Sequence, residues 1–122
     1  MVTFTVGSVV INVVDLDRAQ EFWSAVLGVA PVRSIPGFFV WLQPQHPGGV
    51  SVALQKAFDP KTSRNRVHLD IGVDDLDAAQ TRIEELGGSL VETHNMGDFT
   101  WRVMGDPEGN EFCVLEEGPP SS

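Results

Sequence analysis

The sequence predicts an α+β fold in which tandem βαβββ modules form a curved mixed sheet around a cleft, with the helices on the outer face. The phrase "VVDLDRAQ" at residues 13–20 returns as "VDDLDAAQ" at residues 73–80, an offset of 60 residues. The same order of strand and helix patterns follows each copy. An internal repeat at a fixed offset indicates duplicated structural units. We therefore expect a single domain made of two repeats, about residues 1–56 and 66–118.

The first module begins with residues 7–14, which are rich in Val and Ile and typical of a buried strand. Asp15 is the predicted N-cap of a helix, because its carboxylate can accept hydrogen bonds from free backbone N–H groups. Apolar residues then recur at helical spacing, and Gly28 supplies a stop. Three further strands are expected at residues 30–35, 38–43 and 50–56.

The second module repeats this order after a polar linker, residues 57–65. A strand is expected at residues 66–73, and Asp75 is the predicted N-cap of the second helix. Gly87 and Gly88 end that helix. The remaining strands are expected at residues 89–94, 99–104 and 110–115.

Strand alternation separates two faces of each predicted sheet, because successive side chains point to opposite sides. One face is apolar and should pack under a helix. The other face carries amides, an imidazole, a thiol and small residues, as the wall of a ligand cleft does. Its polar members are Ser8, Asn12, Ser51, Gln55, His68, Asp70, Glu111 and Cys113.

The composition excludes several classes of partner. The formal net charge is −9, from 17 acidic and 8 basic residues, which disfavours nucleic acid and anionic membrane surfaces and would suit a cationic ligand. No apolar run is long enough for a membrane helix, and no basic-then-apolar leader is present, so we expect a cytoplasmic protein. Cys113 is the only cysteine, which rules out an intrachain disulfide.

Two motifs carry a resemblance to a known family: "VVDLDRAQEFWSAVLG" after the first strand, and "DPEGNEF" before the last one. With the tandem βαβββ pattern, they resemble the vicinal oxygen chelate superfamily, and most closely its short glyoxalase-like members. That superfamily holds the glyoxalase I, bleomycin-resistance and extradiol dioxygenase proteins. The resemblance implies this fold over nearly the whole chain, while the motifs say little about a reaction.

The resemblance also implies a divalent metal held by His, Glu or Gln side chains at four positions, one on the first and one on the last strand of each module. These positions carry over to Ser8, Gln55, His68 and Cys113. Such ions need three or four N or O donors, and this set offers one good ligand, His68. Asp70 is the only carboxylate nearby in the sequence. We therefore expect no metal and no other cofactor.

Without a metal, the first functional hypothesis is a site that binds a small organic molecule, as the resemblance to bleomycin-resistance proteins implies. Aromatic residues on the middle strands could form its walls and stack on a planar, cationic ligand, although each of them could instead be ordinary core. These residues are Phe39, Trp41, Phe99 and Trp101.

The second hypothesis is a lyase- or isomerase-type enzyme acting on a small carbonyl compound. His68, with Asp70 or Glu111, would then supply acid–base chemistry or a metal ligand. His46 and His94 lie in or near predicted loops and are expected at the surface. Cys113 is expected to be an inert buried thiol, since no base lies beside it in the sequence.

Each module leaves a sheet face that another module must cover to close a cleft. The second module can come from the same chain or, by exchange, from another copy, and the resemblance implies a homodimer. The sequence does not choose between the two arrangements.

Overall fold

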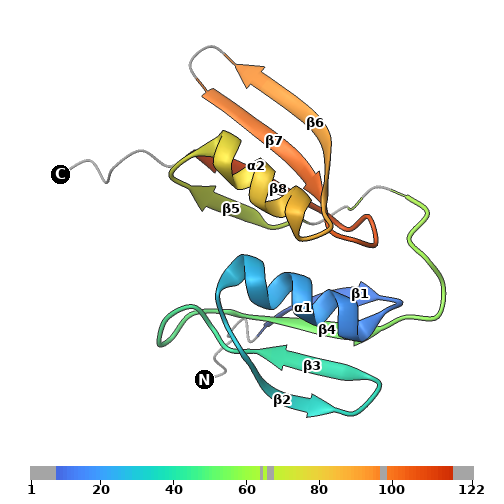
Figure 1. Ribbon diagram of the computed structural model, residues 1–122. Coiled ribbons are helices and arrows are strands. Elements are labelled where there is room, and N and C mark those ends of the chain that lie inside the picture. Colours follow the sequence, from blue (N-terminus) through green and yellow to red (C-terminus); the bar gives the residue numbers. More distant parts are fainter. Residues whose placement is uncertain (1–7, 64, 66–67, 97–98, 117–122) are drawn as a thin grey trace, which may run out of the picture. The chain divides into compact units, whose positions relative to one another are not determined.

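The computed structural model describes residues 8–63, 65, 68–96 and 99–116. The chain divides between Pro60 and Lys61 into two compact units, each a βαβββ module as predicted (Figure 1). Each module has its own four-stranded mixed sheet. That the two modules enclose a shared cleft stays a prediction.

In the first module the first and last strands pair in parallel, and the other neighbours are antiparallel. The strand order is β1-β4-β3-β2. The elements are β1 (Ser8–Val13), α1 (Leu16–Leu27), β2 (Pro31–Ile35), β3 (Phe39–Leu42) and β4 (Ser51–Lys56).

The second module repeats this topology with the order β5-β8-β7-β6 and parallel pairing of β5 with β8. The elements are β5 (Asp70–Val73), α2 (Leu76–Glu85), β6 (Ser89–Met96), β7 (Phe99–Gly105) and β8 (Glu111–Glu116). The expected strand at residues 66–73 is shorter than predicted, because His68 and Leu69 precede β5 outside the regular ladder.

Both helices begin where the repeated phrase predicts. Asp15 Oδ1 accepts from the Arg18 N–H at 3.1 Å, and Asp75 Oδ1 accepts from the Ala78 N–H at 3.0 Å. Gly28 ends α1 in the left-handed region, with φ 68°, which a residue without a Cβ adopts at no steric cost. The duplicated capping residues are therefore the local cause of the duplicated helices.

Long-range hydrogen bonds hold α2 to its sheet. Arg102 on β7 donates to the Asp77 carboxylate at 2.7 Å and to the Gln80 side-chain oxygen at 2.9 Å. Glu116 at the end of β8 accepts from the Leu76 N–H at 3.0 Å, which satisfies a donor in the first turn of the helix. The Arg102 and Glu116 side chains therefore make these contacts on the helix side of the sheet. The pocket described below lies on the opposite face.

Each module buries its own apolar core between helix and sheet. In the first module Phe22 and Trp23 of α1 are each 1% exposed and meet edge to face at 5.2 Å. In the second module Ile83 of α2 and Phe112 of β8 are buried. Within the described residues, no helix has the length and apolarity needed to cross a membrane.

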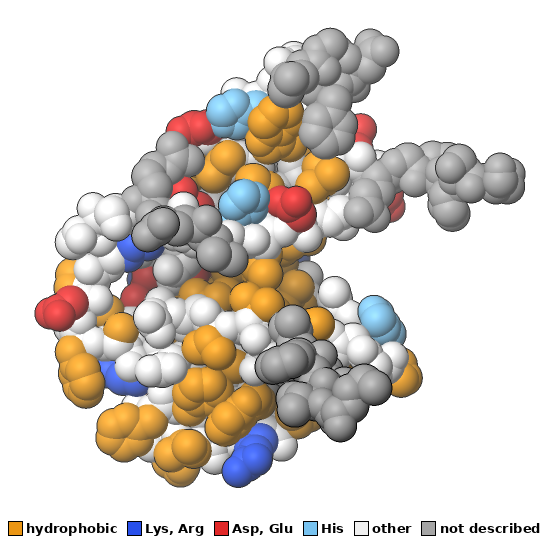
Figure 2. All heavy atoms as spheres, turned by 180° about the vertical axis from the view of Figure 1, so that it is seen from behind, with side chains coloured by type: hydrophobic (Ala, Val, Ile, Leu, Met, Phe, Trp, Pro, Cys, Tyr) orange, Lys and Arg blue, Asp and Glu red, His pale blue; other side chains and the backbone are white. Residues whose placement is uncertain are grey.

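Apolar side chains also reach the surface in clusters (Figure 2). In the first module they include Val32, Ile35 and Phe38, on or beside the edge strand β2, all of whose residues are exposed. An edge strand presents unpaired backbone groups along one side. Apolar side chains are therefore exposed along this edge of the first sheet.

The "DPEGN" turn between β7 and β8 is organised by one buried carboxylate. Asp106 is 3% exposed. Its Oδ1 accepts from the backbone N–H groups of Glu108 at 2.9 Å and Asn110 at 2.8 Å, and its Oδ2 accepts from the Asn110 side chain at 3.1 Å. The carboxylate replaces the hydrogen-bond partners that the backbone loses where the chain reverses.

We expect Asp106→Ala to lower the free energy of unfolding by about 2–3 kcal/mol, because two part-buried N–H groups lose a charged acceptor. Asp106→Asn retains one acceptor oxygen and should cost less than half as much. Urea denaturation followed by circular dichroism measures both values. Asp59→Ala, at an exposed position, is the control and should leave stability unchanged. An Asp106→Ala protein as stable as the parent would show that the turn does not depend on this carboxylate.

Candidate functional site

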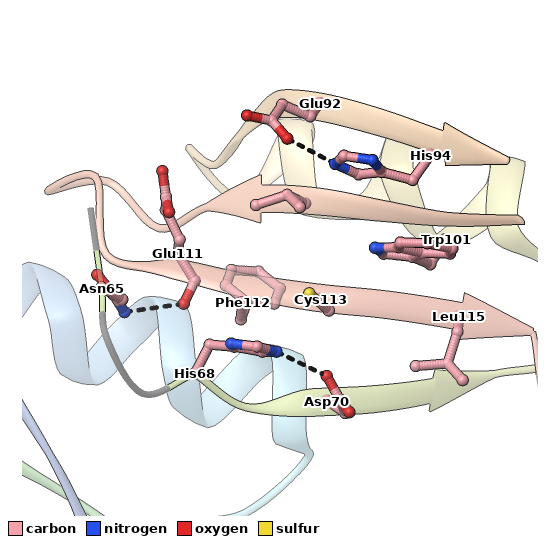
Figure 3. Close-up of a pocket in the computed structure, with 11 residues that line it drawn as sticks. Asn65, His68, Asp70, Glu92, His94, Trp101, Glu111, Phe112, Cys113 and Leu115 are labelled. Atoms are coloured by element: carbon pink, nitrogen blue, oxygen red, sulfur yellow. Dashed lines mark hydrogen bonds and ion pairs between the residues drawn. The ribbon is translucent and has the colours of Figure 1, made fainter.

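A pocket of about 630 Å³ opens on the face of the second sheet opposite α2 (Figure 3). Strand alternation places most of its lining side chains on this face, away from the buried residues under the helix. The lining residues are Asn65, His68, Asp70, Glu92, His94, Trp101, Val103, Glu111, Phe112, Cys113 and Leu115. All of them belong to the second module, so this module forms the described pocket by itself.

The strand register explains why distant residues meet here. Asp70, Cys113, Val103 and Glu92 are successive partners across β5, β8, β7 and β6. Directly paired side chains project to the same face with their Cβ atoms about 5 Å apart. The pocket therefore extends across all four strands of the sheet.

One cluster of three reactive side chains lies at the β5–β8 side of the pocket. The His68 Nε2 and Asp70 Oδ1 atoms are 3.2 Å apart, and these side chains are 49% and 68% exposed. The half-buried Cys113 completes the cluster: its sulfur, an imidazole nitrogen and a carboxylate oxygen all lie within 4.8 Å of one another. The Cys113 N–H donates to the Leu69 carbonyl at 2.8 Å, which ties β8 to the segment carrying His68.

This cluster gives Cys113, which the sequence places on the cleft face of the sheet, a base among its neighbours. Sequence reasoning found no base beside this thiol, because His68 is far from it along the chain. Parallel pairing of β5 with β8 brings the imidazole to the thiol. Cys113 lines the pocket and is half-buried.

A second group lies at the β6–β7 side of the pocket. The His94 ring stacks on Trp101, with ring centroids 4.9 Å apart and planes 12° from parallel. His94 Nε2 lies 2.5 Å from Glu92 Oε2, which holds the imidazole in this orientation. Together they form an aromatic wall, and the Glu92 carboxylate lies beside the His94 ring, as Figure 3 shows.

His94 reaches the surface as expected, with a side chain that is 41% exposed, but it also lines the pocket, which the sequence did not indicate. The strand continues beyond His94 to Met96, so this imidazole lies within the β6–β7 ladder, opposite Trp101. Sequence reasoning did not single out Glu92. The signal that could have found both is the alternation of Glu92 and His94 along an uninterrupted strand. Trp101 lines the pocket, and the Phe99 side chain lies outside the described part of the chain.

Acidic groups predominate around the pocket. Three carboxylates line it, from Asp70, Glu92 and Glu111, against two imidazoles. Asn65 approaches from the segment before β5 and donates to the Glu111 carbonyl at 3.1 Å. This charge balance favours a neutral or cationic ligand over an anionic one.

The predicted site residues of the first module gather on their own sheet. Asn12, Gln55 and Phe39 are successive partners across β1, β4 and β3. Phe39 and Trp41 have ring centroids 4.2 Å apart, and the Arg33 guanidinium lies 4.9 Å from the Trp41 centroid. The Arg33–Trp41 contact is a cation–π interaction.

Ser8 lies apart from this row, at the start of β1 opposite Ser51. Whether this first-module face joins the pocket of the second module stays a prediction.

The donors at the four metal positions implied by the resemblance do not match a hard divalent ion. Ser8 contributes a hydroxyl, Gln55 a neutral amide and Cys113 a soft thiol. In the part of the chain that the structure describes, His68, Asp70 and Cys113 are the one group of three His, Cys, Asp or Glu side chains with adjacent ligand atoms. Hard ions prefer oxygen ligands, several of them charged, so the residues do not fit the metal of the resemblance.

Comparison with known proteins agrees with the motifs. A family model described as a glyoxalase-like domain matches residues 8–115. Glyoxalase 1 from Caenorhabditis elegans is 24% identical over 119 residues, covering 88% of this chain and 41% of that protein. The chain therefore spans less than half the length of this relative.

Two solved structures show the same fold. A member of the glyoxalase/bleomycin resistance protein/dioxygenase superfamily from Sphaerobacter thermophilus is 26% identical, with a TM-score of 0.68, covering 94% of this chain and 98% of that one. The fosfomycin resistance protein FosX from Mesorhizobium loti is 17% identical, with a TM-score of 0.71. The match covers 97% of this chain and 95% of that one.

Proposed function

Because the chain belongs to the glyoxalase-like domain family of the vicinal oxygen chelate superfamily, we propose that it binds a small organic molecule on the open sheet face of its second module, without a metal ion. The observation that carries this proposal is a pocket with an aromatic wall at one side and a polar cluster at the other. Most small-molecule sites combine apolar walls with a few convergent polar groups.

The chemistry of the wall points to a planar ligand of neutral or positive charge. Trp101 offers an aromatic surface on which a flat ring can stack, and His94 extends it. Glu92 and Asp70 place negative charge at opposite sides of the pocket. A flat cation would gain both stacking and electrostatic attraction here.

We expect a cationic aromatic compound from a small panel to bind the parent protein and quench its tryptophan fluorescence. In Trp101→Leu the dissociation constant should rise about tenfold or more, because the ligand loses its stacking on the indole ring. A loss of about 1.4 kcal/mol in binding free energy lowers affinity tenfold. Isothermal titration calorimetry checks the variant that lacks the reporter. Phe58→Leu is the matched control, because Phe58 is an aromatic side chain, 82% exposed, outside the pocket lining. Absence of binding across the panel would contradict the proposal.

The alternative that we propose is a lyase- or isomerase-type enzyme acting on a small carbonyl compound. The specific observation in its favour is the His68–Asp70 pair, 3.2 Å apart at the pocket. A carboxylate that orients an imidazole and stabilises its protonated form is a common arrangement for proton transfer. His68 would take or give the proton, and Asp70 would orient it.

If this alternative holds, we expect His68→Ala to lower the turnover of a methylglyoxal-type substrate by about 10²–10⁴-fold, the usual contribution of one acid–base group. Asp70→Asn should have a smaller effect in the same direction. Turnover is measured by loss of the carbonyl absorbance. Parent protein that does not turn over the substrate, or His68→Ala with full activity, would exclude the alternative.

We expect protein purified and dialysed against a chelator to carry no stoichiometric metal, because the family positions lack the donors for a hard ion. Elemental analysis measures iron, nickel, manganese and zinc. Zinc is included because it accepts imidazole, carboxylate and thiolate ligands, which His68, Asp70 and Cys113 could supply. Near-unit occupancy by any of these metals would overturn the metal-free proposal.

A further inference from the structure

We propose that Cys113 is a nucleophile that captures α,β-unsaturated carbonyl compounds covalently in the pocket of the second module. This inference rests on the proposed small-molecule site and names a chemical class that the site would take. It starts from a juxtaposition: the only thiol of the chain lines the pocket and lies beside an imidazole that is paired with a carboxylate.

The geometry gives the thiol the partners that a nucleophile needs. Donor atoms of Cys113, His68 and Asp70 all lie within 4.8 Å of one another, close enough for small side-chain rotations to bring thiol and imidazole into hydrogen-bonding distance. Cys113 is half-buried, so that it is accessible from the pocket while the strands on either side fix its position. A thiol, a base and a group that orients the base together form the usual constellation for nucleophilic catalysis.

The reaction is redox-neutral and needs no reactant beyond the ligand. The Cys113 sulfur attacks the β-carbon, a C–S bond forms, and the C=C π electrons move towards the carbonyl oxygen. His68 takes the thiol proton, and Asp70 stabilises the imidazolium. The proton then passes to the α-carbon, which leaves a saturated thioether adduct and a neutral imidazole.

The surroundings of the sulfur favour this class of electrophile. Sulfur is a soft nucleophile that reacts readily with conjugated carbon, and a conjugated carbonyl compound is planar. The Trp101–His94 wall can stack on a planar substituent of such a ligand. The carboxylates of Asp70, Glu92 and Glu111 disfavour an anionic electrophile, so the ligand should be neutral or cationic.

N-phenylmaleimide is the probe, because it is a planar, neutral α,β-unsaturated carbonyl compound. Since Cys113 is the only cysteine, intact-mass spectrometry near neutral pH counts one adduct and gives its rate without ambiguity. We expect the folded protein to react about tenfold or more faster than His68→Ala, in line with the contribution of a positioned base. Asp70→Asn should lie between the two, and Cys113→Ser should form no adduct.

Two further measurements separate a base from a merely structural residue. Imidazole added to His68→Ala should restore part of the lost rate, because the exposed site can admit a free base in place of the side chain. His46→Gln is the matched control and should react like the parent, because His46 is an exposed imidazole outside the pocket. Circular dichroism verifies that each variant is folded.

A folded parent that reacts no faster than His68→Ala, or no faster than the same chain unfolded in guanidinium, would overturn the proposal. Loss of rate in His68→Ala without any rescue by imidazole would also count against a base role. Fluorescence titration of Cys113→Ser with the cationic aromatic panel tests the small-molecule site separately. Ligand binding by Cys113→Ser, combined with a parent protein that N-phenylmaleimide does not label, would leave the proposed function standing and reject only the nucleophile.

Discussion

Parallel pairing between the first and last strands of each module is the constraint on which the rest of the structure depends. It joins β1 to β4 and β5 to β8, strands that lie at opposite ends of their modules in sequence. A parallel pair needs a crossover connection, and here the helix and the two middle strands together make that connection. Within each module the helix covers one sheet face, and the pocket of the second module opens on the other face. In the second module the same pairing sets Asp70 beside Cys113.

The two modules share this scaffold but have diverged on the open face. The row Val10, Ala53, Trp41 and Arg33 in the first module corresponds to Asp70, Cys113, Val103 and Glu92 in the second. The edge-strand position thus carries a cation in one copy and a carboxylate in the other. The two copies therefore share their strand pairing and differ in the side chains of the open face.

The same divergence is visible at the helix starts. Lys56, which ends β4, donates to the Val14 carbonyl just before α1, whereas Glu116, which ends β8, accepts from the Leu76 N–H in the first turn of α2. These two positions correspond in the repeat. Each side chain binds the backbone next to its helix, Lys56 as a donor and Glu116 as an acceptor. Backbone groups at a helix start include both donors and acceptors, so either charge can satisfy one of them.

The sequence by itself determined the elements, their duplicated order and the family, because these depend on short-range signals. Asp15 and Asp75 cap helices through contacts within one turn, and alternation along a strand assigns faces without knowledge of its neighbours. Only the tertiary structure decided which side chains meet on a face. Asp70 lies beside Cys113, and His94 lies beside Trp101, because strand register pairs residues on different strands. Register is a long-range property, and a shift of one residue would turn each of these side chains to the opposite face.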